Sequence, residues 1–215
     1  MAITTTPTVE TSESVITFKR RTIDSVLIAL GAVVTVVLLV AGLLLSWGAN
    51  FSDDYVYDEL SSQNIFFADE ESLVAEGRDD LVKFAGMQVT TGEHAEAYAS
   101  YIDGHLQGIA DGATYADLGT PEREARAAWE AAVEDGADEA TVAELKGEYD
   151  AVSGQRNSLF KGETLRGLLL SAFAWSTVGT IAGYAAIFAF VAAAVMAVLV
   201  VLGIRHHHKV VVMES

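Results

Sequence analysis

The sequence of 215 residues contains no cysteine. Disulfide bonds are therefore excluded, and packing must hold together every folded part of the chain. The absence also excludes thiol catalysis, disulfide exchange, and zinc or iron–sulfur sites built on cysteine.

Proline is almost as scarce, since Pro7 and Pro121 are the only two. Alternating apolar and polar residues, the pattern of a half-buried strand, are rare as well. We therefore expect helices throughout the folded part of the chain.

Charge is absent from two long stretches, residues 25–52 and residues 167–204. Each exceeds the roughly 20 apolar residues that cross the hydrocarbon core of a bilayer. A cleavable signal peptide is the rival interpretation of the first stretch. Its apolar core is about twice the usual ~7–15 residues, however, and no small-x-small site follows it. We predict transmembrane helices at residues 23–47 and 175–204.

The second stretch is longer than one crossing requires. Trp175 suits the outer headgroup level and Arg205 the inner one, because aromatic and basic residues favour these positions. About 45 Å of helix separates them, which leaves residues 167–174 (GLLLSAFA) outside the hydrocarbon. We expect the outward continuation of the first helix to cover this segment as a packed stalk, through three apolar residues at near-helical spacing (Phe51, Tyr55 and Leu60).

Basic residues flank both spans on their predicted cytoplasmic sides: Lys19, Arg20 and Arg21 before the first, Arg205 and Lys209 after the second. Short basic flanks stay in the cytoplasm. This rule predicts a multi-pass protein of the cell (plasma) membrane, N-in and C-in, with residues 48–174 outside. The cytoplasmic tails are residues 1–22, rich in Thr, Ser and Glu and predicted to be disordered, and residues 205–215.

The segment between the spans is strongly acidic. Residues 53–166 hold 26 of the 30 acidic residues and 8 of the 13 basic ones. Nucleic acid is excluded as a partner, because binding it needs a basic surface. The sequence thus predicts an all-α membrane protein: a hairpin of two transmembrane helices with an acidic α-helical extracytoplasmic domain between them.

Several elements are predicted inside the outer domain. The first helix should run to about Gln63, followed by an extended or buried turn at residues 64–68. A weak helix is expected at residues 70–85, where Gly77 is unfavourable for a helix interior. Thr90 and Glu93 fit a capping box that opens the clearest helix, and Gly112 fits its stop.

The next helix should begin at Thr120 and Pro121, as N-cap and first helical residue, and end where residues 135–138 break it. A last helix then leads towards the second span, with Gly162 as a candidate kink.

The side chains of His94, Tyr98, Tyr101 and His105 fall within roughly 60° of one another on the helix predicted after Thr90. They are a candidate partner surface for a ligand or a protein. Alternatively, this stripe is the edge of the apolar face, with half-buried tyrosines at the core margin.

Two glycines, Gly179 and Gly183, form a G-x-x-x-G motif inside the second span. Small residues let membrane helices approach closely, so these glycines are candidate helix-packing residues, used either against the first span or in a dimer. The histidines His206–His208 follow the span and fit either a metal-binding tail or a polar, positively biased end of the helix.

Three stretches carry a family resemblance: ELSSQNI at residues 59–65, LVKFAGMQVTTGEHAEAYASYIDGHL at 81–106, and SLFKGETLRGLLLSAFAWSTVGTIAGYAAI at 158–187. They resemble actinobacterial two-span membrane proteins of unknown function, which often carry the label "aromatic ring-opening dioxygenase". The resemblance does not extend to residues 120–157, which look like a variable insertion. It brings no catalytic residues with it.

A non-haem iron oxygenase needs two histidines and a carboxylate at one metal. His94 and His105 are 11 residues apart, about 16 Å along a helix, so one helix cannot bring both to one ion. We therefore expect no dioxygenase activity unless a dimer supplies ligands in trans.

No catalytic, cofactor-binding or metal-binding residue is predicted, and no cofactor. The sequence favours a non-catalytic interaction or structural component of the cell envelope, whose partners are the lipid bilayer and a second copy or another membrane protein. One alternative is a membrane-bound enzyme with a site in the outer helical domain, and another is an oligomeric pore or channel subunit. Neither apolar stretch carries a charge, which disfavours a pump or transporter.

Overall fold

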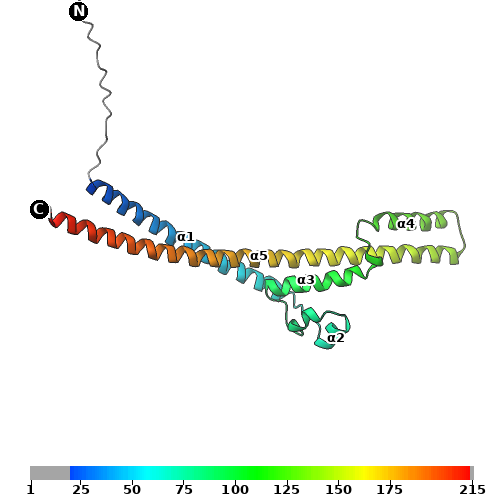
Figure 1. Cartoon of the computed structure of the whole chain (residues 1–215). Coiled ribbons are helices and arrows are strands. Elements are labelled where there is room, and N and C mark those ends of the chain that lie inside the picture. Colours follow the sequence, from blue (N-terminus) through cyan, green and yellow to red (C-terminus); the bar gives the residue numbers. More distant parts are fainter. Residues whose placement is uncertain (1–19, 214–215) are drawn as a thin grey trace, which may run out of the picture. The chain divides into compact units, whose positions relative to one another are not determined.

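The computed structural model describes residues 20–213 and the side chains of residues 22–207. Its elements in chain order are α1 (Arg20–Ser62), α2 (Glu70–Ala75), the 3-10 helix η1 (Asp79–Phe84), α3 (Gly92–Gln107), the 3-10 helix η2 (Ala110–Gly112), α4 (Gly119–Glu134) and α5 (Glu139–Met213) (Figure 1). This part of the chain contains no β-strand, so the predicted all-α class is confirmed. The predicted disorder of the N-terminal tail falls on residues 1–19, outside the described residues, and residues 20–22 already belong to α1.

Two of these helices are long and apolar enough to cross a membrane, over Thr22–Ser62 and Glu139–His207. Only 11% of the most apolar window in each is buried within the structure. A core helix of a soluble protein would be buried on most sides, so these helices present apolar surface to their surroundings.

The chain divides into two compact units, residues 1–44 with 186–215 and residues 45–185. In the described part of the first unit, α1 packs against α5 through small residues. A Cβ added at Gly42 would lie 2.8 Å from the ring of Phe190, and one added at Gly31 would lie 2.8 Å from Val200. As the residue number falls on α1 it rises on α5, so the two segments are antiparallel. Ala186, Ala189 and Ala193 are buried at this contact.

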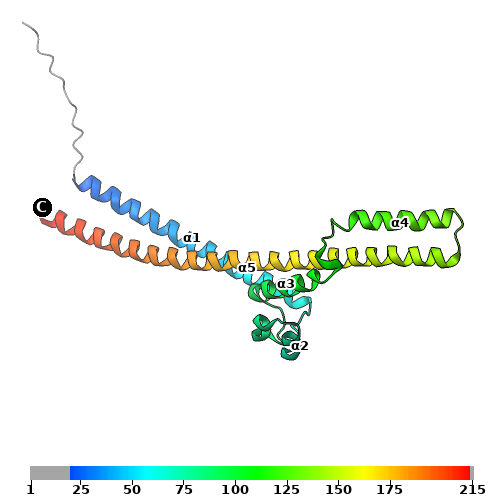
Figure 2. The ribbon, with the colours of Figure 1, turned by 45° about the vertical axis from the view of Figure 1, so that its right-hand side comes forward.

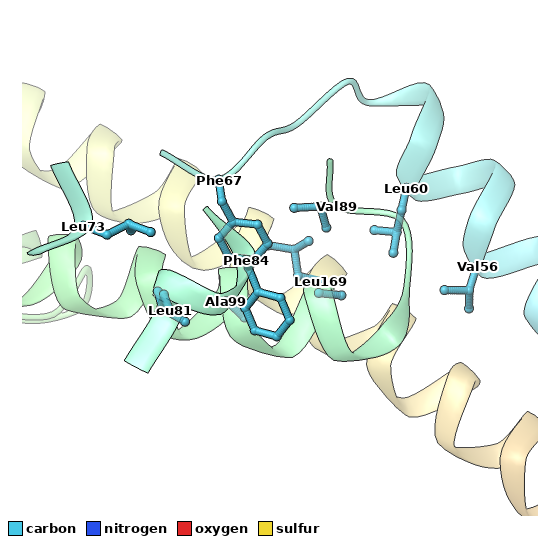
Figure 3. Packing of buried hydrophobic residues seen from close by; sticks show 10 residues of the cluster. Val56, Leu60, Phe67, Leu73, Leu81, Phe84, Val89, Ala99 and Leu169 are labelled. Atoms are coloured by element: carbon cyan, nitrogen blue, oxygen red, sulfur yellow. The ribbon is translucent and has the colours of Figure 1, made fainter. Parts of the chain in front are cut away.

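The second unit contains the main hydrophobic core, formed by parts of α1, α2, η1, α3 and α5. Figure 3 shows Phe67, Phe84 and Leu169 pointing toward one another, and the rings of Phe67 and Phe84 stack with centroids 5.2 Å apart. Leu73 and Val89 are fully buried. The other buried members of this core are Val56, Leu60, Leu81, Ala95 and Ala99.

Backbone hydrogen bonds hold two extended segments of this core against each other. Phe67 N–H donates to the carbonyl of Met87 at 3.0 Å, and Val89 N–H donates to that of Ile65 at 2.9 Å. Phe66 and Gln88 form an isolated antiparallel bridge. The predicted extended turn at residues 64–68 is therefore confirmed, with residues 86–89 as its partner.

The predicted helix over residues 70–85 is wrong, because the chain forms two short helices there. Asp69 caps α2 by accepting from the N–H of Ser72 at 2.8 Å. Gly77 has φ +71°, a conformation that favours glycine, and it separates α2 from η1.

A smaller core follows, built from Leu106, Leu118 and Leu159. Leu106 packs directly on Gly162, where a Cβ would collide with its side chain. The expected kink at Gly162 is wrong, since α5 runs through it. Glycine at this position instead admits a leucine from α3.

Beyond the smaller core, α4 lies alongside the first part of α5 in both views (Figures 1 and 2). We call residues 119–158 the arm. Trp129 stacks on Tyr149 with ring centroids 5.7 Å apart, and Arg156 pairs with Glu122 at 2.6 Å. None of the arm's residues is buried.

Two predicted helix ends in this region need correction. α4 begins at Gly119, with Leu118 as its N-cap, and so starts before Thr120. α3 ends at Gln107, and Gly112 instead closes the 3-10 turn η2 with φ +83°. The predicted break at residues 135–138 is confirmed, since Asp138 caps α5 by accepting from the N–H of Thr141 at 3.1 Å.

Candidate functional site

The start of α3 fixes the first member of the histidine–tyrosine stripe. Thr91 is the N-cap and accepts from the N–H of His94 at 3.1 Å. The Nδ1 atom of His94 in turn accepts from the N–H of Thr90 at 3.4 Å. The predicted capping box of Thr90 and Glu93 is therefore wrong by one residue: His94 takes the reciprocal role, and Glu93 pairs with Lys83 at 2.9 Å.

The first half of the stripe lines the main core. The ring of His94 meets Phe84 edge to face at 5.2 Å between centroids, and Tyr98 meets Phe67 in the same way at 5.3 Å. Both His94 and Tyr98 are half-buried. Burial also raises the pKa of Tyr98. These contacts leave little of either ring free for a partner.

The second half of the stripe borders a pocket between α3 and the link from α2 to η1. Its volume is about 280 Å³, and Glu76, Arg78, Tyr101, Gly104 and His105 line it. His105 Nε2 lies 3.4 Å from a carboxylate oxygen of Glu76. Burial, together with a hydrogen bond to Glu76, raises the pKa of Tyr101 to about 12.

Arg78 holds this pocket together. It donates to both carboxylate oxygens of Asp80 at 2.9 and 2.8 Å, and to the carbonyl and hydroxyl of Ser100 at 3.0 Å each. The hydrogen bond from Arg78 lowers the pKa of Asp80. Because a bidentate pair of this kind fixes both partners, the guanidinium ties the short helices to α3.

Sequence spacing gave no signal for Glu76 and Arg78, because they come from a different segment of the chain than the stripe. The side chains at this pocket can donate and accept hydrogen bonds, and Tyr101 stays a neutral phenol near neutral pH.

The two histidines of α3 are not brought together. His94 lies at the start of the helix against the phenylalanines, and His105 lies in its last turn beside Glu76. Within residues 22–207 no group of three or more histidine, aspartate or glutamate side chains is arranged to hold a metal ion.

The junction between α1 and α5 uses one glycine of the G-x-x-x-G motif for close packing. A Cβ at Gly179 would lie 2.8 Å from the Cβ of Ser52, whereas one at Gly183 would lie 3.8 Å from Ala49. Ser52 is buried, and its hydroxyl donates to the carbonyl of Trp175 at 2.5 Å. Gly179 thus packs against α1 within the same chain.

A column of exposed aromatic rings lies beside this junction. Trp47 stacks on Phe51 with centroids 5.7 Å apart, and Phe51 stacks on Tyr55 at 6.1 Å. Tyr55 then meets Trp175 edge to face at 6.3 Å. We call these four residues the aromatic column.

Next to the column, α1 and α5 form a groove of about 200 Å³. It lies where the stalk was predicted, and α1 covers one face of residues 167–174, where Leu169 is buried against Val56 and Leu60. Of the three residues predicted to make this contact only Leu60 is buried, since Phe51 and Tyr55 are 51% and 44% exposed. The other face is open, since Leu168 is 66% exposed.

The cluster His206–His208 lies at the end of α5 and only partly within the described side chains, because that of His208 falls outside them. His206 is exposed and His207 half-buried.

No family model matches this chain, and comparisons with curated proteins and with solved structures find no match either.

Proposed function

We propose that this chain is an integral protein of the cell membrane that acts as a non-catalytic interaction component of the envelope. Its spans are residues 23–47 and 175–204, both termini are cytoplasmic, and residues 48–174 lie outside. The resemblance to actinobacterial two-span membrane proteins is part of this proposal.

The apolar helices and the aromatic column support this membrane placement. Trp47 and Trp175 sit at the outer ends of the two proposed spans, at 68% and 47% exposure. Tryptophan and tyrosine are enriched at the membrane–water interface, where their rings are partly solvated. The antiparallel pairing of α1 with α5 in the first unit also fits two crossings in opposite directions.

The structure of the arm is the main support for the interaction role. Its 40 residues, 119–158, contribute no buried side chain to either core, and its two helices contact each other through partly exposed rings. A segment that costs backbone entropy to order but adds nothing to a core is best explained by contacts with another molecule.

Charge indicates the kind of surface that the arm would meet. It contains ten acidic and four basic residues. Three of the four basic residues already pair within the arm: Arg126 with Glu130, Lys146 with Asp150, and Arg156 with Glu122. The charge left over is negative, so we expect a partner with a basic surface.

The placement is tested with single cysteines, because the natural chain has none. In intact cells a membrane-impermeant maleimide should label Ala140→Cys, while Ser215→Cys should react only after lysis. Labelling of both, or of Ser215→Cys alone, would refute the proposed orientation.

The interaction role is tested by photo-crosslinking in native membranes from position 133, where Val133 is 53% exposed on the arm. We expect an adduct that weakens with salt and is lost when Glu134 and Glu144 are both replaced by Gln. The matched control replaces Glu70 and Glu71, exposed residues of α2, by Gln and should keep the adduct. An adduct unaffected by the arm charges, or no adduct at all, contradicts the proposed contact.

A further inference from the structure

The groove between α1 and α5 is open to the surroundings and is lined mostly by apolar side chains, with Glu59, Gln63 and Ser171 as its polar lining residues. Leu168, Trp175 and Tyr55 form much of its wall and are 66%, 47% and 44% exposed. Val56 and Leu60 lie at its base and are buried. Apolar surface of this kind gains free energy when another apolar group covers it.

The groove continues the surface that faces lipid in the proposed arrangement. On α5, Leu168, Trp175 and Val178 follow one another at intervals of seven and three, and so share one face of the helix. Val178 is 56% exposed and lies within the second span. On α1 the aromatic column advances by four residues at a time to Tyr55, which lines the groove. An apolar path thus leads from the bilayer into the groove without a charged residue on the α5 side.

The dimensions fit a slender occupant. Lining residues on α5 extend from Leu165 to Trp175, about 15 Å of helix. One lipid tail spans about half of the ~30 Å hydrocarbon core, which is the same length. The volume of about 200 Å³ is below the ~300–1,000 Å³ of sites for compact small molecules.

The acidic residues at the groove distinguish between a lipid and a second copy of the chain as its occupant. Glu59 lines the groove, and Asp58 precedes it on α1. A second copy would bring its own strongly acidic outer domain to the same place, and an anionic headgroup would meet these carboxylates as well. Both approaches are opposed by like charge.

We propose that this groove holds one acyl chain of a neutral or zwitterionic lipid from the outer leaflet. The inference depends on the proposed membrane placement, in which Trp175 marks the outer interface. The lipid tail would replace water on Leu168, Tyr55 and Trp175, and so close the open side of the stalk.

The test uses a small fluorophore on a single cysteine in the full chain, reconstituted in phosphatidylcholine nanodiscs with or without bromine on the lipid tails. Bromine quenches fluorescence on contact. One probe is at Leu168→Cys in the groove. The matched control is Leu170→Cys, which lies only about 3 Å further along the axis but points about 200° away around α5.

We expect strong quenching at position 168 and little at 170. Filling the groove with Ala172→Phe, a lining residue, should reduce quenching at 168 and leave that at 170 unchanged. Equal quenching at both positions would place residues 167–174 in the hydrocarbon, which overturns the groove site and the proposed boundary together.

Absence of quenching at 168, with Ala140→Cys still labelled from outside, would overturn the lipid site while leaving the membrane placement intact. An intermolecular disulfide formed by unlabelled Leu168→Cys would show that a second copy occupies the groove, and would overturn the inference as well.

Discussion

Replacing Gly179 by Ala should loosen the contact between α1 and α5, whereas the same change at Gly183 should not. The Cβ of alanine at position 179 would meet the Cβ and Oγ of Ser52 at 2.8 and 2.9 Å, distances at which something must shift. At position 183 the nearest atom is the Cβ of Ala49 at 3.8 Å, an ordinary contact. The two variants are thus matched in chemistry and in helix, and differ only in the space available.

The magnitude follows from this difference. Alanine gains about 1 kcal/mol of helix propensity over glycine, and this gain is common to both variants. Overpacking costs about 1–3 kcal/mol, and it applies to Gly179 alone, since Ser52 is buried and its hydroxyl is already bonded to Trp175. The free energy of opening the contact should therefore be lower in Gly179→Ala than in Gly183→Ala by about 1–3 kcal/mol, a factor of roughly 5–150 in the opening equilibrium.

A thiol placed at Val56 reports this opening, because Val56 is 3% exposed on α1, one turn beyond Ser52. In detergent or nanodiscs, the maleimide labelling rate of Val56→Cys should rise by that factor in Gly179→Ala relative to Gly183→Ala. Adding Ser52→Gly should restore slow labelling in Gly179→Ala, because it removes the colliding Cβ; Ser52→Ala keeps that Cβ and should not. Equal labelling rates in the two alanine variants would refute the packing argument.

Three further predictions concern the outer domain. Leu73→Ala should destabilise the short helices by about 2–5 kcal/mol, because the side chain is fully buried. Replacing the adjacent Val74, which is 49% exposed, by Ala should cost far less. Hydrogen-exchange mass spectrometry of residues 65–106 measures this difference, and equal exchange in both variants would contradict the prediction. Thr91→Ala should cost α3 about 0.5–2 kcal/mol as the loss of an N-cap, with faster exchange in its first turn, whereas Thr90→Ala should not; the reverse order would restore the cap predicted from the sequence. The pKa of Tyr101 is raised to about 12 from an ordinary value of 10.0, so its contribution to stability is complete below pH 10 and is lost as the pH rises to about 12. The difference in tyrosinate absorbance between the natural chain and Tyr101→Phe should therefore titrate near pH 12. A midpoint near 10 would contradict the burial of Tyr101 and its hydrogen bond to Glu76.

The sequence alone determined the helical class and the positions of the two apolar helices. Length and the absence of charge are local properties, so residues 25–52 and 167–204 could be identified without any knowledge of packing. The end of α1 near Gln63, the extended turn at 64–68 and the break at 135–138 were also predicted, because each depends on a few adjacent residues.

Predictions from adjacent residues failed where a contact with a distant part of the chain decided the role of a residue. Thr90 and Thr91 both fit an N-cap, and in the structure Thr91 takes this role while the ring of His94 meets Phe84 in the core. Likewise Gly162 fits a kink by sequence, but it is the contact with Leu106 from α3 that requires a glycine there.

Only the tertiary structure decided what the candidate site residues touch. It separated His94, at the core, from His105, beside Glu76, and it brought Arg78 to Ser100 from another part of the chain. It also decided that Gly179 serves the α1–α5 contact within one chain, and that α1 leaves Leu168 uncovered while burying Leu169. Such pairings depend on which faces of distant helices meet, and the periodicity of one helix says only that a face is apolar, never what will cover it.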